Sequence, residues 1–133
     1  METPDSSGSR SGLIAVDLSE NEITGFLPPF LAFMPKLSAL SLENNNFTGM
    51  IPVIYAFKTA APNPGISPLE RLLLGGNYLF GPIPEPLRRM KPDSATVRLG
   101  GNCLFRCPTF FFFCEGGEQK STAVCRSAGP MIP

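Results

Sequence analysis

The sequence of this 133-residue chain predicts an α/β fold: a right-handed solenoid of about four coils, with short parallel strands on its concave face. The first observation is a repeat. Residues 16–28, 40–52 and 72–84 match position by position, and a shortened fourth copy begins at residue 97. The second is that two apolar residues flank one outward residue at the start of each copy, the period-two pattern of a short strand. Such arrays mostly recognise other molecules.

Each strand is predicted to place alternate side chains on opposite faces. Leu40 and Leu42 should face inward while Ser41 faces outward. An Asn follows each strand where the backbone turns, and its amide can satisfy backbone groups that lack a partner there. These residues form a predicted structural ladder of Asn21, Asn45, Asn77 and Asn102.

The return path of each coil is predicted from the residues after the Asn. A Gly four residues later suits a tight bend that a Cβ would hinder. The Leu-Pro or Ile-Pro pair that follows favours an extended start to the convex side. Apolar residues then recur every third position, which suits a short 3₁₀-like turn. They are Leu31, Met34 and Leu37 in one coil, and Leu87 and Met90 in another.

Composition divides the chain into three parts. Residues 1–11 are polar and rich in Ser and Gly, so we expect a disordered N-terminal segment. The repeat array spans 12–102, with an insertion near 59–67 that is predicted to be a loop on the convex side. Such a loop is either simply tolerated or a contact island for a partner. A cysteine-rich C-terminal cap and tail occupy 103–133.

The repeats resemble the plant-type leucine-rich repeats, whose consensus is approximately L-x-x-L-x-L-x-x-N-x-L-T-G-x-I-P. Residues 40–52 read LSLENNNFTGMIP. The resemblance covers residues 13 to 105, and it is specific because hydrophobic spacing, Asn, Thr-Gly and Ile-Pro agree in successive units. The four cysteines look like the C-terminal cap of such an array.

This resemblance implies a non-catalytic protein-interaction module, similar to the C-terminal part of the ectodomain of a plant receptor-like protein or receptor-like kinase. The implied partner is a protein or peptide ligand, or a co-receptor, and the implied location of the full-length parent is extracellular or at the cell surface. One alternative is a secreted inhibitor of a cell-wall-degrading enzyme, as in the polygalacturonase-inhibiting members. Another is a structural wall protein.

In related arrays the concave face commonly binds the partner. In register, acidic side chains gather at one end of this face and arginines at the other. Arg71 and Arg98 could hold a carboxylate through paired hydrogen bonds, while a solvated sheet face is the alternative. The candidate partner-binding residues are Asp17, Glu20, Ser41, Glu43, Arg71, Leu73 and Arg98.

The four cysteines, Cys103, Cys107, Cys114 and Cys125, lie together near one end of the chain. An even, clustered number predicts two disulfides in an oxidising compartment, with three possible connectivities. A zinc site is the alternative, although the usual paired C-x-x-C spacing is absent.

Asn46-Phe47-Thr48 is an acceptor sequence for N-glycosylation. The repeat register places Asn46 outward, between the inward Asn45 and Phe47. Given an extracellular route, we expect Asn46 to be glycosylated; an unmodified polar loop residue is the alternative.

Several function classes find little support. The chain has no His, the commonest general base, and its Gly-Gly-Asn segments lack the Lys and Ser or Thr of a phosphate loop. Net charge is zero and the basic residues are dispersed, unlike those of a nucleic-acid binder. The apolar run 110–113, taken as cap core, is too short to span a membrane. We therefore expect no catalysis, cofactor, metal, nucleic acid or membrane span.

The N-terminal residues contain no apolar secretory segment, which conflicts with the extracellular resemblance and suggests a fragment. In a solenoid each coil buries its apolar face only against its neighbours. The unit from Leu13 to Leu37 is then an exposed end, so the isolated chain is predicted to be marginally stable or self-associating.

Overall fold

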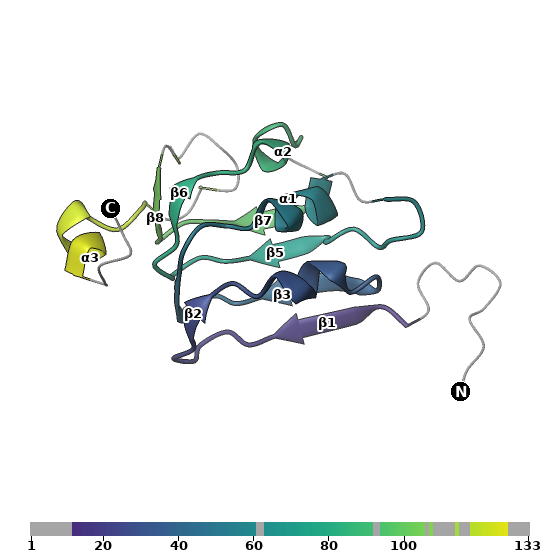
Figure 1. Ribbon diagram of the computed structural model, residues 1–133, viewed down its shortest axis with the longest axis horizontal. Coiled ribbons are helices and arrows are strands. Elements are labelled where there is room, and N and C mark those ends of the chain that lie inside the picture. Colours follow the sequence, from purple (N-terminus) through teal and green to yellow (C-terminus); the bar gives the residue numbers. More distant parts are fainter. Residues whose placement is uncertain are drawn as a thin grey trace.

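The computed structural model describes residues 12–60, 63–91, 94–105, 107, 114 and 118–127. The sequence interpretations of residues 1–11 and 110–113 lie outside these. The described chain forms stacked coils whose strands make a four-stranded parallel sheet in the order β1-β3-β5-β7 (Figure 1). The strands are β1 (Ile14–Asp17), β3 (Leu37–Ser41), β5 (Arg71–Leu73) and β7 (Thr96–Arg98).

The register of this sheet follows the sequence repeat and confirms the predicted parallel solenoid strands. Val16 pairs with Leu40, Leu40 with Leu72, and Leu72 with Val97. These residues point inward, and Leu40, Leu72 and Val97 are buried. Because the side-chain period of a strand is two, the intervening residues all lie on the concave face.

Shorter strands continue each coil after the turn. They form two parallel pairs, and a bridge between Met50 and Phe80 connects one pair to the other. The pairs are β2 (Thr24–Phe26) with β4 (Asn46–Thr48), and β6 (Phe80–Pro82) with β8 (Cys103–Phe105). Gly49 shows why Gly recurs here: its φ is +85°, and a Cβ would lie 2.7 Å from Cδ1 of Phe26.

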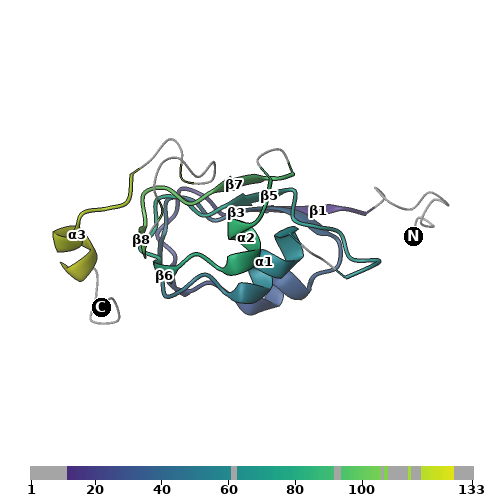
Figure 2. The ribbon, with the colours of Figure 1, turned by 90° about the horizontal axis from the view of Figure 1, so that it is seen from above.

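Helices cover the side opposite the concave sheet (Figure 2). They are the 3₁₀ helix η1 (Pro29–Phe33), α1 (Val53–Ala60) and α2 (Glu85–Arg88). The 3₁₀ turn predicted in the first coil is confirmed by η1. In the coil of Leu87 and Met90 the prediction was wrong, because the segment there is the short α-helix α2. In the second coil the extra residues of the insertion allow two helical turns, so Thr59 and Ala60 are helical rather than part of the predicted loop.

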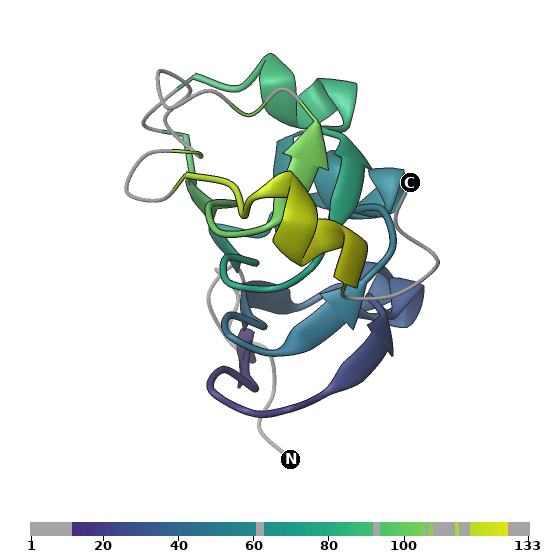
Figure 3. The ribbon, with the colours of Figure 1, turned by 90° about the vertical axis from the view of Figure 1, so that its left-hand side faces the viewer.

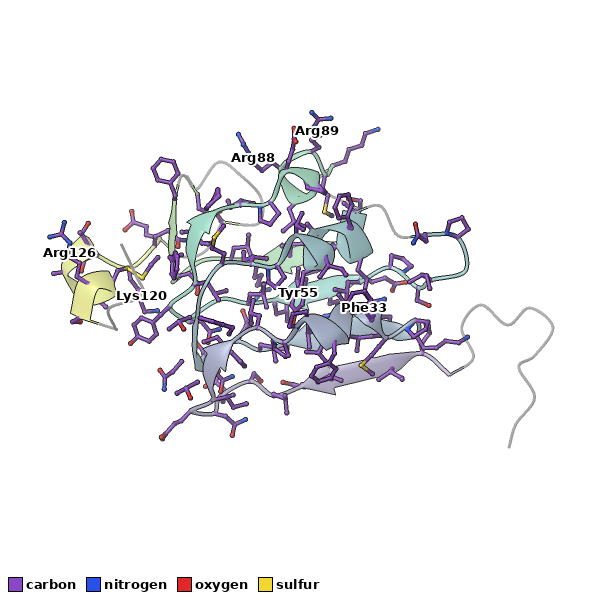
Figure 4. All side chains as sticks on the ribbon, viewed as in Figure 1. Phe33, Tyr55, Arg88, Arg89, Lys120 and Arg126 are labelled. Atoms are coloured by element: carbon purple, nitrogen blue, oxygen red, sulfur yellow. A yellow bond between two sulfur atoms is a disulfide. The ribbon has the colours of Figure 1, made fainter. Side chains whose placement is uncertain are left out.

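The core lies between the concave sheet and these helices. Its fully buried side chains include Tyr55, whose hydroxyl donates to the carbonyl of Pro28 at 2.8 Å (Figure 4). Burial raises the pKa of Tyr55 well above its usual value. The fully buried leucines are Leu27, Leu37, Leu40, Leu42, Leu69, Leu72, Leu74, Leu79, Leu87 and Leu99.

The last described element is α3 (Thr122–Ser127), which lies beyond the C-terminal ends of the concave strands (Figures 1 and 3). A disulfide between Cys103 and Cys125 ties it to β8. Among the residues that the structure describes, none of the helices has the length and apolar character needed to cross a membrane.

Candidate functional site: the concave face

The structure places all seven candidate residues on the concave sheet or the turn that follows it. Ala15, Ala39, Arg71 and Thr96 form one row across the four strands, and the next row is Asp17, Ser41, Leu73 and Arg98. Glu20 and Glu43 follow β1 and β3 at the rim. The acidic residues therefore border the first two coils and the two arginines the last two.

At the acidic end, the carboxylate of Asp17 is held by its own chain. Its Oδ1 accepts hydrogen bonds from the backbone N–H of Ser19 at 3.0 Å and from the Ser19 hydroxyl at 2.6 Å. The hydroxyl bond and then the backbone bond hold the pKa of Asp17 below its usual value. Glu20 accepts a hydrogen bond from the side-chain amide of Asn44 in the next coil.

At the basic end, Arg71 and Arg98 are exposed on neighbouring strands, one strand and two residues apart. Neither has an ion-pair or hydrogen-bond partner for its guanidinium within the described residues. Leu73 faces Arg98 across the strand pair, yet only 8% of it is exposed. It therefore serves as an apolar floor beside the arginines rather than as the exposed position that the sequence suggested.

The glycines at this end do not leave an open edge at which a partner backbone could approach. A Cβ on Gly76 would lie 2.1 Å from Oδ1 of Asn44, and one on Gly75 would lie 3.2 Å from Oε2 of Glu43. Gly76 also has a φ of +73°, and its counterparts Glu20 and Asn44 hold positive φ without being Gly. These glycines are required for the turn and for coil stacking.

The Asn ladder connects each turn to the coil before it. Oδ1 of Asn45 accepts from the N–H of Ile23, and its Nδ2 donates to the carbonyl of Leu18 at 2.9 Å. In the same way, Asn77 accepts from the N–H of Phe47 and donates to the carbonyl of Leu42. Asn102 accepts from the N–H of Leu79 and donates to the carbonyl of Leu74. Asn45, Asn77 and Asn102 are buried. Asn21 is exposed, and within the described chain it bonds only to carbonyls of its own turn.

The structure reveals a fifth rung that the sequence analysis missed. Oε1 of Gln119 accepts from the N–H of Leu104 at 2.8 Å, and its Nε2 donates to the carbonyl of Leu99 at 3.1 Å. These two groups occupy the positions that each Asn serves in the preceding coil. The carbonyl of Glu118 accepts from the N–H of Gly101, as Gly100 does from Gly76. A single segment of the cap thus imitates the next coil.

Lys120 fastens the same segment. Its ammonium donates to the carbonyls of Asn77 and Gly101 and lies 4.6 Å from the ring centroid of Tyr78. Burial lowers the pKa of Lys120. Figure 4 shows it between the coils and α3, the position from which it joins the cap to two turns.

All four cysteines are in disulfides, Cys103 with Cys125 and Cys107 with Cys114. This selects one of the three connectivities that the sequence left open, and it removes the thiolates that a zinc site would need. Asn46 is exposed on β4, while Phe47 next to it is buried. Its side chain is accessible, and glycosylation remains a prediction.

Comparisons with known proteins agree with this geometry. The leucine-rich-repeat family model matches residues 12–34, 36–56 and 68–90, which is half of the chain. No curated protein matches. The solved BIR2 ectodomain from Arabidopsis thaliana is 31% identical over 71% of this chain and 46% of its own, with a TM-score of 0.53. The ectodomain of the receptor kinase SOBIR1 from Arabidopsis thaliana is 20% identical over 80% of this chain and 60% of its own, with a TM-score of 0.53.

The chain therefore spans between 46% and 60% of the length of these two ectodomains. The second comparison is below 25% identity and concerns the fold alone. The family match, the parallel strands and the ladder of turn amides lead to one conclusion: the chain belongs to the leucine-rich-repeat family and has the fold of a plant receptor ectodomain.

Proposed function

We propose that this chain is a non-catalytic module that binds a protein or peptide ligand, or a co-receptor, on its concave face as part of a plant receptor-like ectodomain. The observation that carries the proposal is the pair of exposed guanidinium groups, Arg71 and Arg98, which face the same side of the sheet without intramolecular partners in the described chain. Together the two guanidinium groups offer an anionic ligand several hydrogen-bond donors on one face of the sheet.

The spacing of these side chains defines the ligand chemistry. One strand and two residues place the two Cα atoms about 8 Å apart. Guanidinium groups at this separation can both reach one carboxylate, and each can present two parallel N–H donors to it. Leu73, opposite Arg98 and two residues from Arg71, forms a largely buried apolar floor beside them. A peptide with a free carboxyl terminus, or with an Asp or Glu beside an apolar residue, fits this arrangement.

The disulfides support an extracellular setting for this module. Such bonds persist in oxidising compartments and are rare in the cytosol. Asn46 lies on β4, outside the concave sheet, so a glycan there would leave Arg71 and Arg98 accessible. The acidic end of the concave face, near Asp17 and Glu20, would steer a ligand's carboxylates toward the arginines.

The test is selection from a random displayed peptide library on the purified chain, followed by resynthesis of the selected peptides. We expect the selected peptides to be rich in carboxylates and to lose about tenfold or more in affinity when Arg71 and Arg98 are both replaced by Glu. Amidation of the carboxyl terminus, or replacement of an acidic residue by its amide, should have a similar effect.

The matched control is a double replacement of Arg88 and Arg126 by Glu. It changes the net charge equally, and these exposed residues lie on α2 and α3, outside the concave sheet (Figure 4). Equal binding by wild type and the control, with loss only for the Arg71/Arg98 variant, supports the proposal. Peptides that bind all three proteins alike would show that the concave arginines are not the site.

A further inference from the structure

The helical side of the solenoid carries a cavity that the proposed function does not use. It has a volume of about 350 Å³ and lies where α1 of the second coil contacts η1 of the first. Its lining comes from η1, α1 and the insertion that follows α1, and it includes Phe33, Ile54, Phe57, Lys58, Asn63 and Ile66. Because a coil stacks only on its direct neighbours, a cavity between two described coils does not depend on where the array begins.

One cation belongs to this cavity. Of the described residues that line it, Lys58 alone is titratable, and it is only 3% exposed. An ammonium has three N–H donors, yet within the described chain that of Lys58 makes one hydrogen bond, to the carbonyl of Ser67, and no ion pair. Burial lowers the pKa of Lys58 from its usual value. A buried cation without a counter-ion is costly, and a bound anion would offset that cost.

The rest of the lining is mostly apolar and partly uncovered. Phe33 is 67% exposed and Phe57 is 49% exposed, so both rings keep a large area that this chain does not bury. Ile54 and Ile66 are half-buried, and Asn63 is exposed. Small-molecule sites combine apolar walls with a few polar groups in volumes of about 300–1,000 Å³. The cavity matches this description, and its polar groups are an amide and an ammonium.

The insertion near 59–67 builds one wall of this cavity. Its end is attached to both coils: the N–H of Ser67 donates to the carbonyl of Pro35 at 2.8 Å, and the N–H of Leu69 donates to the carbonyl of Lys58 at 3.1 Å. Asn63 and Ile66, which lie between α1 and these bonds, line the cavity. A coil of the usual length has no such segment, so the cavity is a product of the insertion.

We propose that this cavity binds a small apolar carboxylate, whose charged group pairs with the ammonium of Lys58 and whose apolar part packs against Phe33 and Phe57. An apolar cavity of about 150 Å³ holds benzene, so a ligand of about ten to fifteen non-hydrogen atoms matches the volume of this one. The site is separate from the concave arginines, because the helices lie on the opposite side of the solenoid (Figure 2).

The experiment is a titration of the purified, isotopically labelled chain with phenylacetate and with octanoate, followed through the NMR signals of its backbone amides. Each acid is compared with its own neutral amide, which has nearly the same shape without the charge. We expect saturable shifts at Phe33, Ile54 and Ile66 with the acids, and binding about tenfold weaker or more with the amides. This comparison needs no variant.

Three variants locate the site. Lys58→Met removes the charge while keeping a long side chain, and we expect it to bind the acids about 30-fold more weakly or worse. Lys91→Met is the matched control, because Lys91 is exposed and lines the neighbouring cavity between α1 and α2. Phe33→Ala changes an exposed position and keeps the ammonium, so it tests the site even if Lys58→Met does not fold. It should weaken octanoate binding about fivefold.

The outcomes separate this site from general attraction of anions. Weaker binding by Lys58→Met and Phe33→Ala, with wild-type affinity for Lys91→Met, supports the proposal. It is overturned if neither acid binds the wild-type chain saturably, or if acids and amides bind alike. Equal weakening by Lys58→Met and Lys91→Met would indicate attraction by surface charge alone, which also overturns it.

Discussion

The turns at the two ends of the solenoid differ in how their hydrogen-bonding groups find partners. At the C-terminal end, Gln119 bonds to Leu104 and Leu99, and the disulfide between Cys103 and Cys125 holds the cap in place. At the N-terminal end, Asn21 is exposed and bonds only within its own turn in the described chain. Each ladder amide serves the coil before it, so the last coil alone depends on a residue from outside the repeats.

The two ends therefore differ in the kind of group that depends on a cap. Without Gln119, a backbone N–H and a backbone carbonyl of the last turn would lose their partners while partly buried, which is costly. At the first coil the corresponding loss falls on the side chain of Asn21, which water reaches. What the first coil leaves uncovered is apolar surface, at Ile14 and Leu18.

The largest expected effect comes from opening the cap. Replacement of Cys103 and Cys125 by Ser should lower the free energy of unfolding by about 3 kcal/mol, because the bond closes the longer loop. The same change at Cys107 and Cys114, whose loop is shorter, should cost about 2 kcal/mol. Urea unfolding of the two variants measures both. A larger loss for the second pair would contradict the importance of the cap helix.

The next prediction compares the two end rungs directly. Gln119→Ala should destabilise the chain by about 2 kcal/mol, because two backbone groups of the last turn lose their partners. Asn21→Ala should change stability by less than about 0.5 kcal/mol, as expected for an exposed position. Chemical denaturation of both variants is the measurement. Equal losses would mean that the two ends are equivalent after all.

Lys120 gives a smaller, pH-dependent effect. Lys120→Met should cost about 1 kcal/mol near neutral pH through lost hydrogen bonds to Asn77 and Gly101. Burial lowers the pKa of Lys120 in the folded state, so above that pKa the unfolded chain binds more protons. Stability therefore rises as pH increases toward the ordinary Lys value. The rise should be weaker in Lys120→Met, as urea titrations at several alkaline pH values would show.

The smallest effect concerns the open end. Ser19→Ala removes the hydroxyl that donates to Asp17, the main cause of its lowered pKa. The pKa of Asp17 should move up toward its usual value while the remaining bond from the Ser19 N–H keeps part of the shift. Side-chain carboxyl NMR titration of both proteins tests this. An unchanged pKa would show that the hydroxyl does not hold the carboxylate in solution.

Much of the fold follows from the repeat. The strand register could be predicted from the sequence, because a slip of one residue would turn every core side chain to the solvent face. It aligns Val16, Leu40, Leu72 and Val97. Gln119 could not be found that way. It follows Asn102 by 17 residues, less than a coil, and its longer side chain reaches the turn from a segment without repeat character.

Other details of the fold also differ from the prediction. The coil of Leu87 and Met90 forms the α-helix α2 instead of a 3₁₀ turn, and α1 takes in Thr59 and Ala60 of the predicted loop. Leu73 is buried although its register places it on the concave face. The space beside Gly75 and Gly76 is occupied by the side chains of Glu43 and Asn44 from the preceding coil. Contacts between coils decide these details, and a pattern within one coil does not contain them.

The direction of the ladder also bears on synthesis at the ribosome. Because the amide of Asn45 completes the turn before it, the first coil reaches its full set of bonds only after the second has emerged. The same delay applies to each later coil, and the fourth waits for Gln119 near the end of the chain. Folding would therefore follow translation one coil behind, and a polypeptide that stops before Gln119 would always present one unfinished turn to chaperones and proteases.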